Sequence, residues 1–179
     1  MPTISDYVGY ELEWVKPNWL KNDYELRVNG NSVLGQMRMH GASRAEAWIP
    51  EYTFSLQRKG FWKPTLAVTQ LETQMPIATL SRLGNGGALD FADGQTQQYV
   101  WAKPRVFSAE HRWIDSAGRP VLHVQSSGWK TSVKITFEPI ASQSAGLGLL
   151  VVIAGFLAII AYQEAANTAA TTTVVSAGM

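Results

Sequence analysis

The chain has 179 residues, of which 46% are hydrophobic and 16% charged, and this describes a folded protein long enough to bury a core. Its formal net charge of +1 provides no long-range field that would gather nucleic acid, so we expect no nucleic-acid partner. The absence of cysteine excludes disulfides, thiolate catalysis, iron–sulfur clusters and cysteine zinc sites.

The start of the chain carries no secretion signal that we can identify. Residues 1–10 begin polar and lack a basic region followed by an apolar run. We therefore expect a cytoplasmic protein, either free or associated with a membrane, with a single-pass membrane protein inserted late through its C-terminus as the alternative.

Apolar and polar side chains then alternate with a period of two, which predicts short β-strands. The run at 24–28 is followed by Asn29-Gly30-Asn31, a hairpin turn signal, and the return strand places Val33, Met37 and Met39 on one face. Similar runs occupy residues 10–14, 44–49, 52–57, 65–71, 76–82, 88–92, 97–101, 107–115, 120–126 and 132–138. The pattern predicts a single antiparallel β domain of about twelve strands, spaced as in sandwiches and barrels.

The segment from Ala145 to Tyr162 contains no charged residue and ends the run of strands. A helix that is apolar all round lies inside a large core or spans a membrane. Its length of roughly 27 Å approaches the thickness of a bilayer, so a transmembrane helix over 145–162 is one interpretation. The other is a plug, because a barrel of about twelve strands has a lumen too wide for its own side chains to fill.

The late hairpin reads His111-Arg112-Trp113-Ile114-Asp115-Ser116-Ala117-Gly118-Arg119-Pro120-Val121-Leu122 and contains an Asp-x-x-Gly turn between two strands. Together with the strand count and the apolar helix that follows the last strand, it resembles the superfamily of tubby C-terminal domains, phospholipid scramblases and LURP-one-related proteins. The resemblance implies an all-β fold, a closed antiparallel barrel of about twelve strands around a central hydrophobic C-terminal helix.

The same resemblance defines the expected boundaries. The barrel domain covers residues 1–165 and includes the central helix at 146–163, and residues 166–179 form a low-complexity tail. The superfamily is known for binding phosphoinositide headgroups through basic residues in tubby proteins and for scrambling lipids in others. No binding motif of the family matches residue by residue.

One loop combines basic and aromatic residues. Arg58, Lys59 and Lys63 are the candidates for binding a lipid headgroup, and Phe61 and Trp62 are the candidates for the membrane interface. An ordinary solvated turn with Trp62 folded back onto the barrel is the competing interpretation. Further tryptophans would be able to form a stacking platform or to fill the core: Trp14, Trp19, Trp48, Trp101 and Trp129.

The chain shows no recognisable catalytic set. His111 and His123 fall on neighbouring predicted strands and would be able to hold a metal ion together with Glu110, but we favour separate barrel residues. No strained Gly-x-Ser-x-Gly elbow is present, and the glycines at 84–87 fit a hairpin turn better than a phosphate loop. We expect no catalytic residues, no bound metal and no cofactor.

Three hypotheses follow. The first is a non-enzymatic tubby-like or LURP-one-like domain that binds lipid headgroups, a membrane surface or a protein partner. The second is a tail-anchored membrane protein with a cytoplasmic β domain. The third is a lipid-active or hydrolytic enzyme, for which His111 and His123 are the only suggestive residues.

Overall fold

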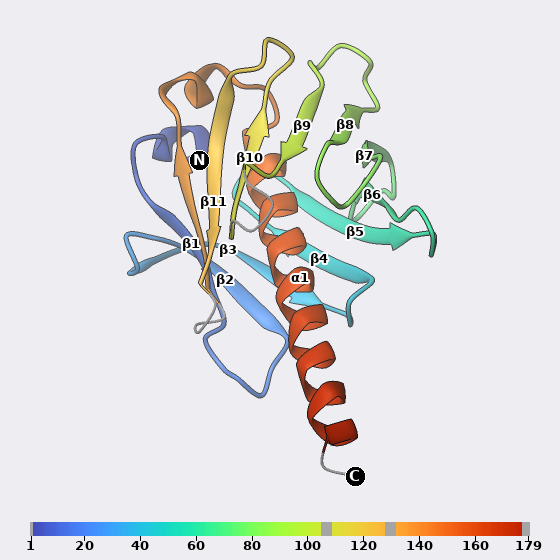
Figure 1. Cartoon of the computed structure of the whole chain (residues 1–179). Helices are drawn as coiled ribbons and strands as arrows, with labels where there is room; N and C mark the ends of the chain where they lie inside the picture. The colour runs from blue at the N-terminus through green and yellow to red at the C-terminus, as the bar shows by residue number, and fades with distance from the viewer. Residues whose placement is uncertain (1, 105–108, 128–131, 177–179) are drawn as a thin grey trace.

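The strands form a closed antiparallel barrel around one helix, as the sequence predicts (Figure 1). The computed structural model describes residues 2–104, 109–127 and 132–176, with side chains as far as residue 169. Each strand pairs with its neighbours in the chain, and β1 pairs with β12 to close the barrel. Closure leaves no unpaired edge strand that would invite aggregation.

The twelve strands are short, and each is joined to the next by a turn or loop. Their bounds are β1 Leu12–Val15, β2 Asp23–Val28, β3 Ser32–Met39, β4 Arg44–Trp48, β5 Thr53–Lys59, β6 Thr65–Gln70, β7 Pro76–Leu80, β8 Gly87–Phe91, β9 Tyr99–Ala102, β10 Glu110–Ile114, β11 Pro120–Ser126 and β12 Ser132–Phe137. Two single-turn helices, η1 Ile4–Tyr7 and η2 Pro139–Gln143, and the long helix α1 Leu147–Ser176 complete the chain.

Helix α1 runs through the barrel and emerges at its far end (Figure 1). Every side chain from Leu147 to Ile160 is buried, and exposure begins at Ala161. The helix ends at Ser176, so it continues past residue 163, where the apolar pattern weakens and the sequence-based prediction stopped. The stretch Leu147–Ala169 is long and apolar enough to cross a membrane, and 67% of its most apolar window is buried within the barrel.

Indole N–H groups of the barrel wall bond directly to the backbone of α1. Trp14 Nε1 donates to the carbonyl oxygen of Val151 at 3.2 Å, and Trp113 Nε1 donates to that of Leu150 at 3.0 Å. A buried indole N–H needs an acceptor, and in an apolar lumen the helix carbonyls are the acceptors within reach. These bonds set both the height and the rotation of the helix in the barrel.

The predicted inward face of β3 is wrong at its first residue, Val33. Met37 and Met39 point inward as expected, but Val33 is 49% exposed. The cause is a β-bulge, since Leu26 pairs with Gly35 while the next residue, Arg27, pairs with Val33. The extra residue turns Val33 to the outer face of the sheet, because a one-residue slip exchanges the two faces.

The antiparallel connections alternate between the two ends of the barrel. Because β12 leads into α1, the helix begins at the same end as the β2–β3, β4–β5, β6–β7, β8–β9 and β10–β11 connections, which we call the helix-start end. The other connections surround the point where α1 leaves the barrel, and we call this the helix-exit end. They comprise residues 16–22, 40–43, 60–64, 81–86, 103–109 and 127–131, of which 105–108 and 128–131 lie outside the described residues.

Gly155 tests how closely α1 fits its barrel. A Cβ atom at this position would lie 2.4 Å from Trp14 Nε1, whose ring is held by its bond to Val151. We expect Gly155→Ala to lower the free energy of unfolding by about 1–2 kcal/mol, because overpacking outweighs the gain in helix propensity.

Gly148→Ala is the matched control. The nearest atom to its new methyl group is Cδ1 of Ile49, the flexible end of a side chain, so we expect a smaller loss. Urea unfolding of both variants measures the difference. Equal midpoints for Gly155→Ala and the parent would show that Trp14 does not limit the approach of the helix.

Candidate functional site

The basic and aromatic loop predicted from the sequence is the hairpin between β5 and β6, at the helix-exit end. Gly60 has a φ of +83°, and a Cβ there would lie 3.2 Å from the carbonyl oxygen of Lys63, so the tight turn requires glycine. The turn directs Phe61 and Trp62 away from the barrel, and they are 87% and 91% exposed. Their rings meet edge to face with centroids 5.5 Å apart, so Trp62 packs on Phe61 and is not folded back onto the wall.

The three predicted basic residues of this hairpin have different surroundings. Lys59 and Lys63 are exposed. Arg58 is only 26% exposed at its side chain, because its guanidinium forms an ion pair with Glu164 on the emerging part of α1. Arg58 therefore fastens the helix to the barrel wall, and Lys59 and Lys63 are the residues of the three that are open to a headgroup.

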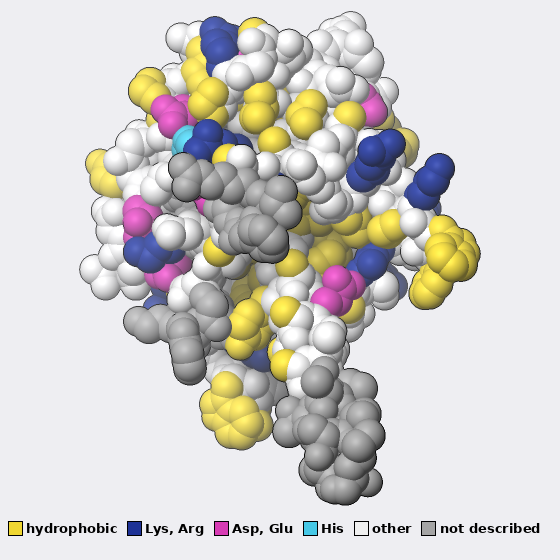
Figure 2. Space-filling view, in the orientation of Figure 1, with side chains coloured by type: hydrophobic (Ala, Val, Ile, Leu, Met, Phe, Trp, Pro, Cys, Tyr) yellow, Lys and Arg dark blue, Asp and Glu magenta, His cyan; other side chains and the backbone are white. Residues whose placement is uncertain are grey.

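A second hydrophobic tip lies on the β1–β2 loop of the same end, and of its residues the sequence analysis named only Trp19, as a candidate for a stacking platform or for the core. Trp19 is 81% and Leu20 is 72% exposed, and Lys21 beside them is exposed as well. Figure 2 shows hydrophobic side chains projecting on either side of the helix, with Lys and Arg side chains beside the right-hand group. The available signal was an adjacent Trp and Leu flanked by two lysines in a loop that has no alternating pattern.

Charge is divided between the two ends of the barrel. The helix-exit connections contain no Asp or Glu in the sequence, and their described basic residues are Lys16, Lys21, Lys63, Arg82 and Lys103. The helix-start end comprises the N-terminal segment, the β12–α1 connection and the strand connections of that end. Its one basic residue among Lys and Arg is Arg119, and its acidic residues are Asp6, Glu11, Glu51, Glu72, Asp93, Asp115 and Glu138. A net charge near zero therefore conceals a protein with one basic and one acidic end.

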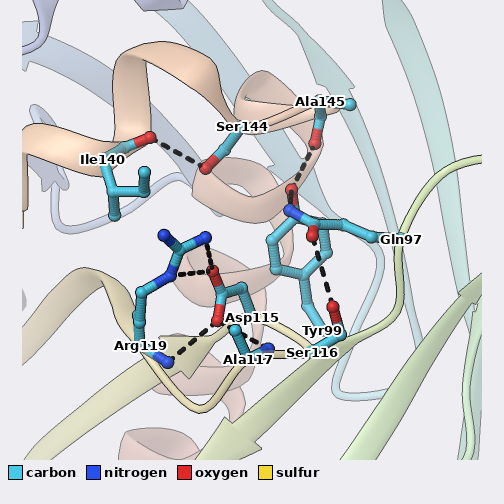
Figure 3. A network of polar contacts seen from close by, with 9 residues as sticks. All are labelled: Gln97, Tyr99, Asp115, Ser116, Ala117, Arg119, Ile140, Ser144 and Ala145. Carbon is cyan, nitrogen blue, oxygen red and sulfur yellow. Dashed lines mark hydrogen bonds and ion pairs between the residues drawn. The ribbon is translucent and has the colours of Figure 1, made fainter.

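The helix-start end is held by a polar network (Figure 3). Asp115 begins the predicted Asp-x-x-Gly turn, and its carboxylate accepts hydrogen bonds from the backbone N–H groups of Ala117 and Arg119 and from the Arg119 guanidinium. The backbone N–H of Arg119 is the main reason that the pKa of Asp115 is lowered. Beside this turn, the Tyr99 hydroxyl donates to the carbonyl oxygen of Ala145 at 3.0 Å and ties β9 to the start of α1.

The two histidines of the metal hypothesis lie on opposite faces of the sheet. His111 pairs with Val124 and points inward, where its ring stacks on Trp101 with centroids 4.9 Å apart. His123 pairs with Arg112 and points outward. The geometry thus separates the pair, and no group of three metal-ligating side chains able to hold an ion occurs among the described residues.

His123 and its neighbours form an ion-pair cluster on the outer wall. Its Nδ1 lies 2.9 Å from Glu110 Oε1, and its Nε2 lies 2.6 Å from Glu138 Oε1. The hydrogen bond from His123, followed by that from Arg112, lowers the pKa of Glu110. The contacts of His123 with Glu110 and Glu138 join β11 to β10 and to the end of β12, which is a structural role.

The candidate tryptophans that the structure describes do not form a stacking platform. Trp14 and Trp101 are buried in the core, Trp48 is partly buried, and Trp19 is exposed beside Leu20 on the β1–β2 loop. Trp129 lies outside the described residues. The core interpretation is therefore correct for Trp14 and Trp101.

His111 makes the stability of the barrel depend on pH. Burial, with Lys103 adding a smaller effect, lowers its pKa below the ordinary value of 6.5, and its Nδ1 has no hydrogen-bond partner among the described residues. Below pH 6.5 the unfolded chain therefore binds a proton that the folded chain resists, so folding stability falls as the pH drops through this value.

We expect His111→Phe to keep the ring stack on Trp101 and to flatten this dependence. Unfolding midpoints of the variant and the parent, measured between about pH 7.5 and about pH 5.5, check the expectation. The same slope in both proteins would assign the pH dependence to other groups.

The sequence matches no protein-family model and no curated protein. Among solved structures, the X-ray structure of a protein from Arabidopsis thaliana is similar, with a TM-score of 0.54 and 10% sequence identity over 84% of this chain and 93% of that chain. At this identity the likeness concerns the fold alone. The Arabidopsis protein is a LURP-one-related family member, so this chain has a barrel like that of a LURP-one-related protein.

Proposed function

We propose that this protein is a non-enzymatic barrel domain whose helix-exit end docks on an anionic membrane surface. The observation that carries the proposal is the pairing of exposed aromatic tips with basic loops at one end of the barrel. Trp prefers the interface between water and lipid, and each Lys or Arg near an anionic surface contributes about 1 kcal/mol. Exposed hydrophobic side chains of this size on a soluble surface mark an interaction site.

The two aromatic tips suit a flat partner. Phe61 and Trp62 project from the β5–β6 hairpin, Trp19 and Leu20 project from the β1–β2 loop, and α1 emerges between them (Figures 1 and 2). A bilayer would contact both tips at once, whereas a peptide groove would require a continuous concave surface. The tips would enter the interface, and the lysines beside them would remain at the level of the headgroups.

The distribution of charge would orient the molecule at the surface. An anionic leaflet attracts the basic end and repels the acidic end, so the barrel axis would stand toward the membrane normal. Anionic lipids are concentrated in the cytoplasmic leaflet, and this agrees with the cytoplasmic location expected from the sequence. The fold likeness to a LURP-one-related protein supports the scaffold, and the choice of a lipid partner rests on the surface of this chain.

Vesicle binding tests the proposal. We expect the protein to bind phosphatidylcholine vesicles that contain phosphatidylserine and to bind pure phosphatidylcholine vesicles weakly. Lys59→Ala with Lys63→Ala should weaken binding by about 2 kcal/mol, roughly 30-fold, and salt should reduce the difference. Phe61→Ser with Trp62→Ser should weaken binding to both kinds of vesicle, measured by flotation.

A matched double variant separates position from net charge. Arg27→Ala with Lys134→Ala removes the same charge from the barrel wall beside β1, away from the helix-exit loops. Equal losses of vesicle binding in the two double variants would contradict docking through one end.

A tail anchor is the second candidate, because Leu147–Ala169 is long and apolar enough to span a membrane. Membrane fractionation distinguishes it from docking. We expect alkaline carbonate to release the full-length protein, because α1 fills the barrel. We also expect a chain of residues 1–144 to aggregate, since it would leave a wide apolar lumen empty. A carbonate-resistant full-length protein with a soluble, folded truncation would establish the anchor.

A further inference from the structure

A cleft of about 490 Å³ lies at the helix-start end, opposite the proposed membrane-docking surface. It is bounded by the N-terminal segment, the β4–β5 and β8–β9 connections and the first turn of α1. This volume falls in the range of sites for small organic ligands. Neither the closure of the barrel nor the proposed membrane contact makes use of this space.

The walls of the cleft combine aromatic rings with acidic groups. Tyr52 and Phe91 contribute rings, and Glu51 and Asp93 contribute carboxylates. Among the described residues that line the cleft there is no Lys and no Arg. Aromatic faces and carboxylates together attract organic cations and reject anions.

Glu51 has an acceptor that the protein leaves unused. Its Oε1 accepts a hydrogen bond from the backbone N–H of Ile4, while Oε2 is buried and has no partner among the described residues. A buried carboxylate oxygen without a donor is costly, so a ligand that supplies an N–H group would gain from satisfying it. The positive end of the α1 dipole also faces this region, but it amounts to about half a charge against the full charge of Glu51.

Glycines let the start of α1 pack closely against the wall of the cleft. Gly146 has a φ of +70°, and a Cβ on it would lie 2.8 Å from the ring of Phe91. A Cβ on Gly148 would lie 2.5 Å from Cδ1 of Ile49 and 3.6 Å from Glu51 Oε2. Both glycines line the cleft, so the first turn of the helix approaches the wall and Glu51 closely.

We propose that this cleft binds a small organic cation, an amine attached to a flat apolar body. The body lies against the rings of Tyr52 and Phe91, and the ammonium group is directed to Glu51. Asp93, exposed on the β8–β9 connection, and the other acidic groups of this end raise the local concentration of cations. The ligand enters from the side of the barrel that faces away from the proposed membrane surface.

Three probes with a common indole ring test the charge requirement: tryptamine, the neutral tryptophol and the anionic indole-3-propionate. We expect calorimetry on the full chain to show tryptamine binding at least about tenfold more tightly than tryptophol, with no binding of the anion. Amide chemical shifts should change at the residues lining the cleft. Equal affinity for the three probes, or shift changes only elsewhere, would overturn the proposal.

Two variants place the ligand, with a third as control. Glu51→Gln keeps an acceptor for the Ile4 N–H and should weaken tryptamine at least about tenfold. Ala92→Trp, at an exposed position on the cleft wall, should block all binding without touching the core. Glu72→Gln removes an acid from the same end but outside the cleft lining, and should leave affinity within about twofold. Unchanged tryptamine affinity in both Glu51→Gln and Ala92→Trp would overturn the proposal. We expect neither substitution to change vesicle binding, so this test is independent of the proposed membrane docking.

Discussion

The structure depends on the need to enclose a helix that has no polar face. Every side chain of α1 from Leu147 to Ile160 is apolar or glycine and is buried, so the helix requires apolar contacts in all directions. A closed sheet of twelve strands provides them and would be too wide without the helix. Each component therefore corrects the instability of the other. The indole N–H groups of Trp14 and Trp113 then fix the helix at one height by bonding to its carbonyls.

This axial helix divides the molecule into two ends with different chemistry. Where α1 leaves the barrel, the connections are basic and carry exposed aromatic side chains, which suit an anionic surface. Where α1 begins, the connections are acidic and surround a cleft with an unused carboxylate oxygen on Glu51. Because strand connections alternate between ends, residues distant in sequence share one surface, and Lys21 and Lys63 lie at the same end although two hairpins separate them. A barrel with these ends would be able to hold a small cation while it rests on a membrane.

Local patterns predicted the candidate site only in part. The hairpin with Phe61, Trp62 and Lys63 could be predicted because its basic and aromatic residues are adjacent in the chain. The partner of Arg58 could not, since Glu164 is brought to it only by the passage of α1 through the barrel. His111 and His123 lie on neighbouring strands, as the sequence predicts, but only the register, which places His111 opposite Val124 and His123 opposite Arg112, decides that they face opposite sides of the sheet.

The sequence by itself determined the number of strands, the order of turns and the all-round apolarity of residues 145–162, because these follow from local periodicity and composition. Only the tertiary structure decided that the apolar helix is enclosed, that the bulge at Leu26 turns Val33 outward, and that charge is separated between the two ends. The physical reason is that the enclosure of the helix, the register of the strands and the separation of charge between the two ends all follow from strand pairing. They depend on contacts between residues far apart in the chain, and a single sequence records the residues but not their partners.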